Sequence, residues 1–96
     1  MIEIFRNEEK KVCTSNDDDI QQVTIKISAW FSPDLEKLIY QASIKENRHF
    51  NFQTQEKYLH CSSQAKATIL AVEEWKEYLN HFELYLKQIG WHFEGS

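Results

Sequence analysis

The sequence predicts an α+β fold, with an antiparallel sheet of four or five strands packed by one short helix and one long C-terminal amphipathic helix. Three patterns carry this prediction: an alternation of apolar and polar residues over 20–31, a helix-start signal at residue 32, and a long apolar stripe between residues 62 and 90. Because the chain has only 96 residues, we expect residues 1–96 to form one small domain.

The first 19 residues predict a short hairpin followed by a turn. Residues 2–6 begin with an apolar–polar alternation. A second short segment, residues 10–14, follows the polar segment "NEE". The segment "SNDDD", residues 15–19, predicts a solvated turn because Asn and Asp side chains bond to their own backbone. A polar loop is the simplest interpretation of this segment, and contact with a cation or a basic partner is the alternative.

Residues 20–31 form the clearest strand. Its apolar face carries Val23, Ile25, Ile27, Ala29 and Phe31. Thr24, Lys26, Ser28 and Trp30 lie on the other face. This pattern is typical of an antiparallel sheet with one buried and one wetter face. Trp30 is therefore expected to project from the polar face, unless a helix, the tail "WHF" or a partner covers it.

Residues 32–47 predict the short helix. Ser32 can cap its first turn, Pro33 suits the first helical position, and Asp34 suits the positive end of the helix dipole. Asn47 is a plausible terminator. The expected buried stripe consists of Leu35, Leu38, Ile39 and Ala42.

Residues 48–53 and 57–61 predict two more strands, joined by a turn near 54–56. The side chains expected to face the core are Phe50, Phe52, Leu59 and Cys61. Because neighbours on a strand point to opposite faces, His49, Asn51, Tyr58 and His60 are then expected to share the outer face with Trp30.

The strongest signal is a helix from Ser62 or Ser63 to Gly90. Its apolar stripe consists of Val72, Trp75, Leu79, Phe82, Leu86 and Ile89, widened by Tyr78 and Tyr85. Gly90 suits the left-handed position after a helix, and Trp91 is expected to fold back on Leu86.

The length of this helix raises a further expectation. About 27 residues span roughly 40 Å, whereas a compact domain of this size is about 32 Å across. The first half, around Trp75, is therefore expected to pack on the sheet. The second half, around Phe82, Tyr85, Leu86 and Ile89, is expected to reach the edge of the domain and to need cover from a second copy or a target.

Composition narrows the classes of function. The chain has 11 basic and 15 acidic residues and a net charge of −4, whereas proteins that neutralise many duplex phosphates usually carry a basic excess. Two cysteines are too few for a disulfide scaffold. With no signal peptide or transmembrane stretch in the sequence, a cytoplasmic location is expected.

A thiol or metal site is the most obvious chemistry to test. The candidate residues by type are Cys13, His49, His60 and Cys61. However, His60 and Cys61 diverge if they lie on a strand, and neither a CxxC nor an HxxxH pair occurs. We therefore predict no catalytic residues, metal or cofactor, and a buried structural role for Cys61.

These observations favour a small acidic binding protein that inhibits or regulates a macromolecular partner by occluding its surface, as phage anti-defence proteins, antitoxins and immunity proteins do. The partner is expected to be a protein. Two kinds of partner fit: a basic nucleic-acid-handling protein and a second copy of this chain. Candidate partner-binding residues are Asp17, Asp18, Asp19, Trp30, Tyr58, His60, Glu73, Glu74, Glu77, Phe82 and Tyr85.

Two alternatives remain open. The first is a single-stranded nucleic-acid-binding module that uses an aromatic sheet face, for which Lys26, Arg48 and Lys57 are the nearby basic residues. The second is a small thiol or metal enzyme that uses Cys13, His60 and Cys61.

Overall fold

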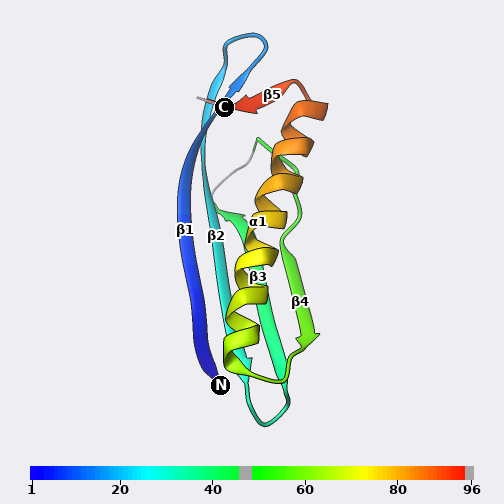
Figure 1. Cartoon of the computed structure of the whole chain (residues 1–96). Helices are drawn as coiled ribbons and strands as arrows, with labels where there is room; N and C mark the ends of the chain where they lie inside the picture. Colours follow the sequence, from blue (N-terminus) through cyan, green and yellow to red (C-terminus); the bar gives the residue numbers. More distant parts are fainter. Residues whose placement is uncertain (46–48, 95–96) are drawn as a thin grey trace.

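The computed structural model describes residues 1–45 and 49–94, which form a five-stranded antiparallel sheet with a long helix along one face (Figure 1). The elements in chain order are β1 (Ile2–Ser15), β2 (Ile20–Ser32), β3 (Lys37–Lys45), β4 (Gln55–His60), α1 (Gln64–Gln88) and β5 (Trp91–Phe93). The strand order is β4-β3-β2-β1-β5. The first four strands therefore form a meander, and β5 returns to the outer side of β1. The predicted α+β class is confirmed.

The N-terminal segment is one strand of 14 residues, so the predicted short hairpin within it is wrong. It pairs with β2 from Ile2 opposite Phe31 to Thr14 opposite Ile20, with an irregularity between Glu3 and Phe5. The polar residues in its middle do not end the strand, because pairing with β2 satisfies the backbone groups on that side while their side chains reach solvent.

The predicted turn at residues 15–19 is confirmed. The Ser15 hydroxyl oxygen accepts hydrogen bonds from the backbone N–H groups of Asp17 and Asp19, at 3.1 and 3.0 Å. Asp18 takes the left-handed conformation, with φ of 64°, which Asp tolerates better than most residues. The three acids therefore cap the β1–β2 hairpin.

The predicted helix at 32–47 is wrong: residues 33–36 form a turn and β3 follows it. The signal at Ser32 serves the turn instead, since its hydroxyl accepts the N–H of Leu35 at 3.4 Å. Glu36 takes a left-handed φ of 48°, and Leu35, expected in the buried stripe, is 64% exposed. Asn47, the expected terminator, lies outside the described residues.

A period of two was the correct interpretation of this segment. Leu38, Tyr40 and Ala42 are fully buried, and they alternate with residues on the other face of the sheet. The strand is favoured because β2 and β4 pair with it on both sides, and because aromatic and β-branched residues such as Tyr40 and Ile44 pack well on a pleated surface.

Only the second of the two strands predicted at 48–61 forms, as β4. Arg48 lies outside the described residues, and 49–54 form no strand. This segment is held by side chains rather than by a ladder: the Tyr85 hydroxyl accepts the N–H of Asn51 at 2.9 Å, and the Tyr78 hydroxyl donates to the carbonyl of Gln53 at 3.1 Å. Phe50 is buried as predicted.

The long helix is confirmed at both ends. Ser63 caps it by accepting the N–H of Lys66 at 3.2 Å. Gly90 follows its end with φ of 82°, a conformation that favours glycine. The Gly90 carbonyl accepts the N–H of Asn16 at 2.9 Å, which ties the end of α1 to the β1–β2 hairpin.

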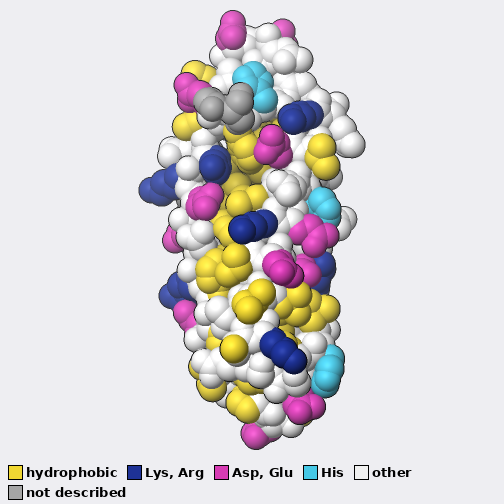
Figure 2. Space-filling view, viewed as in Figure 1, with side chains coloured by type: hydrophobic (Ala, Val, Ile, Leu, Met, Phe, Trp, Pro, Cys, Tyr) yellow, Lys and Arg dark blue, Asp and Glu magenta, His cyan; other side chains and the backbone are white. Residues whose placement is uncertain are grey.

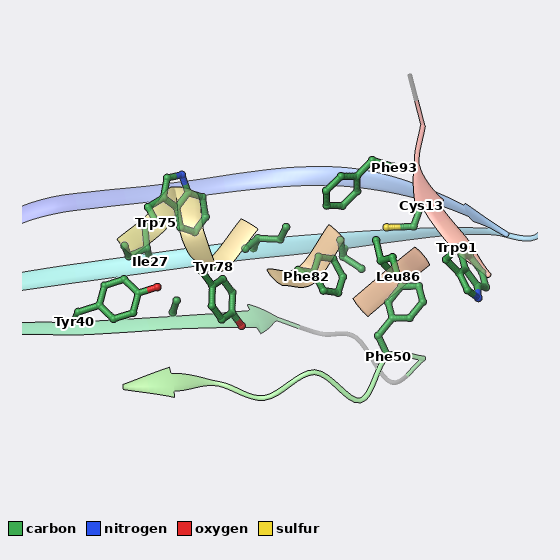
Figure 3. Packing of buried hydrophobic residues seen from close by; sticks show 13 residues of the cluster. Cys13, Ile27, Tyr40, Phe50, Trp75, Tyr78, Phe82, Leu86, Trp91 and Phe93 are labelled. Carbon is green, nitrogen blue, oxygen red and sulfur yellow. The ribbon is translucent and has the colours of Figure 1, made fainter. Parts of the chain in front are cut away.

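The buried side chains lie between α1 and the sheet. Figure 3 shows Trp75, Tyr78, Phe82 and Leu86 from α1 alongside strand residues such as Ile27. Trp91 and Phe93 of β5 close one end of this cluster, so the tail "WHF" extends the sheet and does not cover the outer face.

The expected overhang of α1 is wrong, because the body is elongated. The molecule measures 51 × 20 × 19 Å, whereas the scaling that gave 32 Å assumes a compact shape. A strand of 14 residues spans about 46 Å, so β1 and β2 run the full length of α1, which spans about 37 Å. Phe82 and Leu86 have no exposed surface. The length of the helix therefore gives no reason for a second copy.

Candidate functional site

The face of the sheet opposite α1, which we call the open face, is not covered by any element in the described part of the chain. The strand register assigns its side chains. Trp30 lies opposite Ile39, and Ile39 lies opposite Tyr58, so these three residues form one row across β2, β3 and β4. We call them the aromatic row. The prediction that Trp30 and Tyr58 share the outer face is confirmed.

The aromatic row is accessible. Trp30 and Ile39 are half-buried, and Tyr58 is 61% exposed. The Tyr58 hydroxyl donates a hydrogen bond to the Glu56 carboxylate, and this bond raises the pKa of Tyr58. The bond tethers the Tyr58 ring from one side and leaves its face open, so the row offers large apolar contacts of defined position.

A polar hollow lies beside the aromatic row. It has a volume of about 310 Å³ and is lined by Arg6, Lys26, Ser28, Trp30, Gln41 and Ser43. These residues come from β1, β2 and β3, where the register places Arg6 opposite Ser28 and Ser28 opposite Gln41. Trp30 lines the hollow and also begins the aromatic row, so the two features form one continuous site.

The two basic side chains of the hollow, Arg6 and Lys26, differ in their ion pairs. The guanidinium of Arg6 contacts the carboxylate of Glu3 at 2.9 Å. Lys26 lies opposite Glu8 in the register but makes no ion pair with any described residue. Arg6 therefore keeps only part of its donor capacity free, whereas Lys26 keeps its whole charge.

The open face is less acidic than the rest of the protein. By register, its basic residues are Arg6, Lys10, Lys26, Lys37 and Lys45, and its acidic residues are Glu3, Glu8 and Glu56. The chain as a whole carries a net charge of −4. The acidic excess therefore lies elsewhere, on the hairpin tip and on the helix side.

His60 also lies on the open face. It ends β4 opposite Lys37 and is exposed. Its chain neighbour Cys61 is buried, so the predicted divergence of this pair is confirmed. An exposed imidazole next to a lysine suits the rim of a contact surface.

The six acidic candidates lie away from the open face. Asp17, Asp18 and Asp19 form the tip of the β1–β2 hairpin. Glu73, Glu74 and Glu77 belong to α1, on the other side of the sheet. Glu74 is engaged with Lys57 of β4 at 2.8 Å. Lys57, expected beside the aromatic face, therefore points to the helix side, and the acids do not join the aromatic row in one surface.

Phe82 and Tyr85 do not form a docking stripe. Phe82 is fully buried, and Tyr85 is half-buried against it with ring centroids 6.2 Å apart and nearly parallel planes. Because Phe82 already packs inside the core, it presents no surface for the partner contact expected of it. Figure 2, seen from the helix side, shows acidic and basic side chains interspersed over this surface.

The described residues do not assemble a thiol or metal site. Cys13 and Cys61 belong to different core clusters. Burial raises the pKa of the Cys13 thiol to about 11, which keeps it protonated and unreactive near neutral pH. The Cys61 thiol donates to the Ser63 carbonyl at 3.5 Å. No cluster of three or more His, Cys, Asp or Glu residues suited to a metal occurs among residues 1–45 and 49–94.

The outer edge of β1 is a second uncovered feature. β5 pairs with residues 13–15 of β1, and the Glu94 N–H donates to the Val12 carbonyl at 2.8 Å, so residues 2–11 have no outer strand partner within the described chain. This edge is rich in charge, and the N–H of Glu8 is bonded to the side-chain oxygen of Asn7 at 3.0 Å. Charged edge strands resist pairing with other chains, so we take this edge to be protected.

Six residues of the site are absent from the partner-binding residues predicted from the sequence. The alternation of β2 already placed Lys26 and Ser28 on the outer face, so the hollow could have been anticipated on that strand. Ile39, Gln41 and Ser43 were not assigned to the outer face because residues 32–47 were interpreted as a helix. Arg6 was lost because β1 was divided into two short strands.

Comparisons of the chain with protein-family models, curated proteins and solved structures found no match. Across the residues that the structure describes, none of the helical segments has the length and apolar character needed to cross a bilayer. The case for a function therefore rests on the geometry of the open face.

Proposed function

We propose that the protein is a small binding protein that inhibits or regulates a protein partner by occluding its surface, and that it docks through the open face. The observation that carries this proposal is the accessible aromatic row of Trp30, Ile39 and Tyr58, bordered by the polar hollow.

The composition of the open face matches that of protein interfaces. Binding energy at interfaces concentrates in a few aromatic and Arg side chains, surrounded by hydrogen-bonding groups. Trp30 and Tyr58 supply the anchors, and Ser28, Gln41 and Arg6 supply the surrounding groups. Trp30 is held in place before binding because β2 is paired on both sides, and the Tyr58 ring is held by its hydrogen bond to Glu56. Anchors fixed in this way reduce the entropy lost on association.

The size of the face also suits occlusion. Four strands are about 19 Å across, and the nine residues of β3 span about 30 Å. The projected area is roughly 570 Å², comparable in scale to the 800 Å² or so that each partner contributes to a standard interface. Small antitoxins, immunity proteins and phage anti-defence proteins act by covering a partner in this way, and that analogy rests on size and chemistry alone.

Single-stranded nucleic-acid binding is the second candidate. The aromatic row and the basic residues of the open face favour it, since bases stack on aromatic side chains beside a basic groove. The three acidic residues on the same face oppose it. The two candidates differ in ligand, so one set of variants tests both.

The test is affinity capture from a lysate of the producing organism, followed by binding measurements with each captured protein. Trp30→Ala and Tyr58→Ala are each expected to weaken binding at least tenfold. Ile69→Ala is the matched control, because Ile69 is 63% exposed on α1, away from the open face. Circular dichroism confirms folding of each variant.

Unchanged binding by Trp30→Ala and Tyr58→Ala would refute docking through the open face. If instead a fluorescent decathymidine binds wild-type protein with a salt-dependent affinity that Trp30→Ala abolishes, the nucleic-acid function replaces the proposed one.

A further inference from the structure

Building on the proposed function, we infer that the polar hollow receives a carboxylate side chain of the protein partner, while an apolar side chain beside that carboxylate rests on Trp30. The partner segment would thus pair an acidic residue with an apolar neighbour. This differs from the basic partner that the net charge of the chain first favours.

The hollow has the donors that a carboxylate requires. Arg6 and Lys26 reach it from adjacent strands, and Ser28 and Ser43 add hydroxyl groups. A carboxylate has two oxygens and about four acceptor sites, so it can use several of these donors at once. Ser28 retains only 9% of its surface, which places it at the floor of the hollow, where a bound group would be shielded from water.

The existing contacts of Arg6 and Lys26 leave hydrogen-bond donors available for an incoming carboxylate. Lys26 makes no ion pair among the described residues, so it can bind an incoming anion without breaking one. Arg6 is held by Glu3 at 2.9 Å, and this contact orients the guanidinium. Arg has five N–H donors, so donors remain after Glu3 is satisfied. Charge-assisted bonds of this kind are among the stronger hydrogen bonds in proteins.

The acidic residues of the face favour a single carboxylate over a chain of phosphates. Glu3 and Glu8 lie on β1 on either side of Arg6, and Glu56 lies on β4 beside Tyr58. A single-stranded nucleic acid that stacked on Trp30 and Tyr58 would bring successive phosphates near these three carboxylates. The hollow is lined by Arg6 and Lys26 but by none of these three carboxylates, so one acidic side chain gains the attraction of Lys26 with less repulsion than a chain of phosphates would meet.

The test uses nuclear magnetic resonance of the full-length protein, titrated with the capped dipeptide acetyl-Leu-Glu-amide and with its neutral counterpart acetyl-Leu-Gln-amide. We expect saturable shifts of the backbone amides of Lys26, Ser28 and Ser43 with the acidic peptide, and an affinity at least threefold weaker for the neutral one. Lys26→Gln, which removes the charge from a surface side chain, should abolish this preference.

Lys87→Gln is the matched control, because Lys87 lies on α1 and pairs with Glu83; it should keep the preference. Arg6→Gln provides a second variant of the hollow and should also reduce it. Equal affinity for the two peptides, or an undiminished preference in Lys26→Gln, would overturn the inference. Saturable shifts at the same amides with decathymidine, at lower concentration than with the acidic peptide, would assign the hollow to nucleic acid instead.

Failure of the inference can be separated from failure of the proposed function. If the peptides show no preference while Trp30→Ala still loses the captured partner, the docking face stands and the carboxylate assignment falls. If the acidic peptide is preferred while Trp30→Ala and Tyr58→Ala keep the partner, the hollow binds carboxylates but the open face is not the docking surface.

Discussion

Adjacent residues of β2 lie in opposite environments. Ile25 and Ile27 have no exposed surface and pack beneath α1, whereas Lys26 and Trp30 are only half-buried on the open face. The two faces share one backbone, one set of hydrogen bonds and one register. Only the direction of each side chain decides whether it contributes to folding or remains free for binding.

The helix side of the sheet is the face that folding constrains. On the helix side, Tyr40 and Tyr78 are buried with their hydroxyls bonded to backbone carbonyls, and no buried side-chain polar atom among the described residues lacks a partner. On the open face, the aromatic row is not required to close a core. Large aromatic side chains that folding does not require are candidates for contact with another molecule.

The largest effect is expected on the helix side. Phe82→Ala and Trp75→Ala should each lower the free energy of unfolding by about 3–5 kcal/mol, because each leaves a large cavity in a packed core. Urea denaturation measures this loss, with Phe82→Leu as a milder variant should the alanine protein fail to fold. Leu84→Ala, at an exposed position on α1, is the control. A small effect at Phe82 would mean that the stripe is not core.

The helix side should also respond to alkaline pH. Burial raises the pKa of Cys13 from 9.0 to about 11 and that of Tyr78 from 10.0 to about 12. The folded state holds these protons more tightly, so the stabilising contribution of Cys13 is complete below pH 9 and is lost as the pH rises to about 11. Between pH 8 and 10.5, Cys13 should account for roughly 2 kcal/mol of lost stability.

Urea denaturation at the two pH values checks this expectation. Cys13→Ala, which cannot ionise at that position, should lose about 2 kcal/mol less stability between pH 8 and 10.5 than the wild-type protein does. An identical pH dependence in the two proteins would show that Cys13 is not buried as a neutral thiol.

A smaller effect is expected where β4 is fastened to α1. The Lys57–Glu74 pair is 2.8 Å apart and partly buried, so a double-mutant cycle with Lys57→Met and Glu74→Gln should give a coupling of about 1 kcal/mol. The exposed Lys87–Glu83 pair, at 3.5 Å, should couple by less than about 0.5 kcal/mol. Equal couplings would mean that burial does not distinguish the two pairs.

The smallest effect on stability is expected on the open face. Tyr58→Ala should change the free energy of unfolding by no more than about 0.5 kcal/mol, as exposed substitutions usually do, although it should weaken partner binding. Thermal and urea denaturation of this variant, compared with Phe82→Ala, contrast the two faces directly. A loss of several kcal/mol at Tyr58 would mean that the aromatic row is part of the folding core.

Sequence alone determined the elements whose signals are local and unambiguous. The strand at β2 follows from alternation, and the β1–β2 turn follows from "SNDDD". The helix α1 follows from the apolar stripe between Val72 and Ile89, with Ser63 before it and Gly90 after it. Alternation also placed Trp30 and Tyr58 on the outer face, because direction on a strand depends only on the parity of the residue number.

Tertiary structure decided the features for which the local sequence pattern allowed more than one structure. Residues 37–45 carry apolar side chains at both helical and strand spacing, and pairing with β2 and β4 selected the strand. The long sheet built from β1 and β2 gave α1 a full-length surface, which buried Phe82 and left no overhang. The polar hollow depends on register between three strands, a property that arises only when the strands pair, because no single strand holds both Arg6 and Lys26.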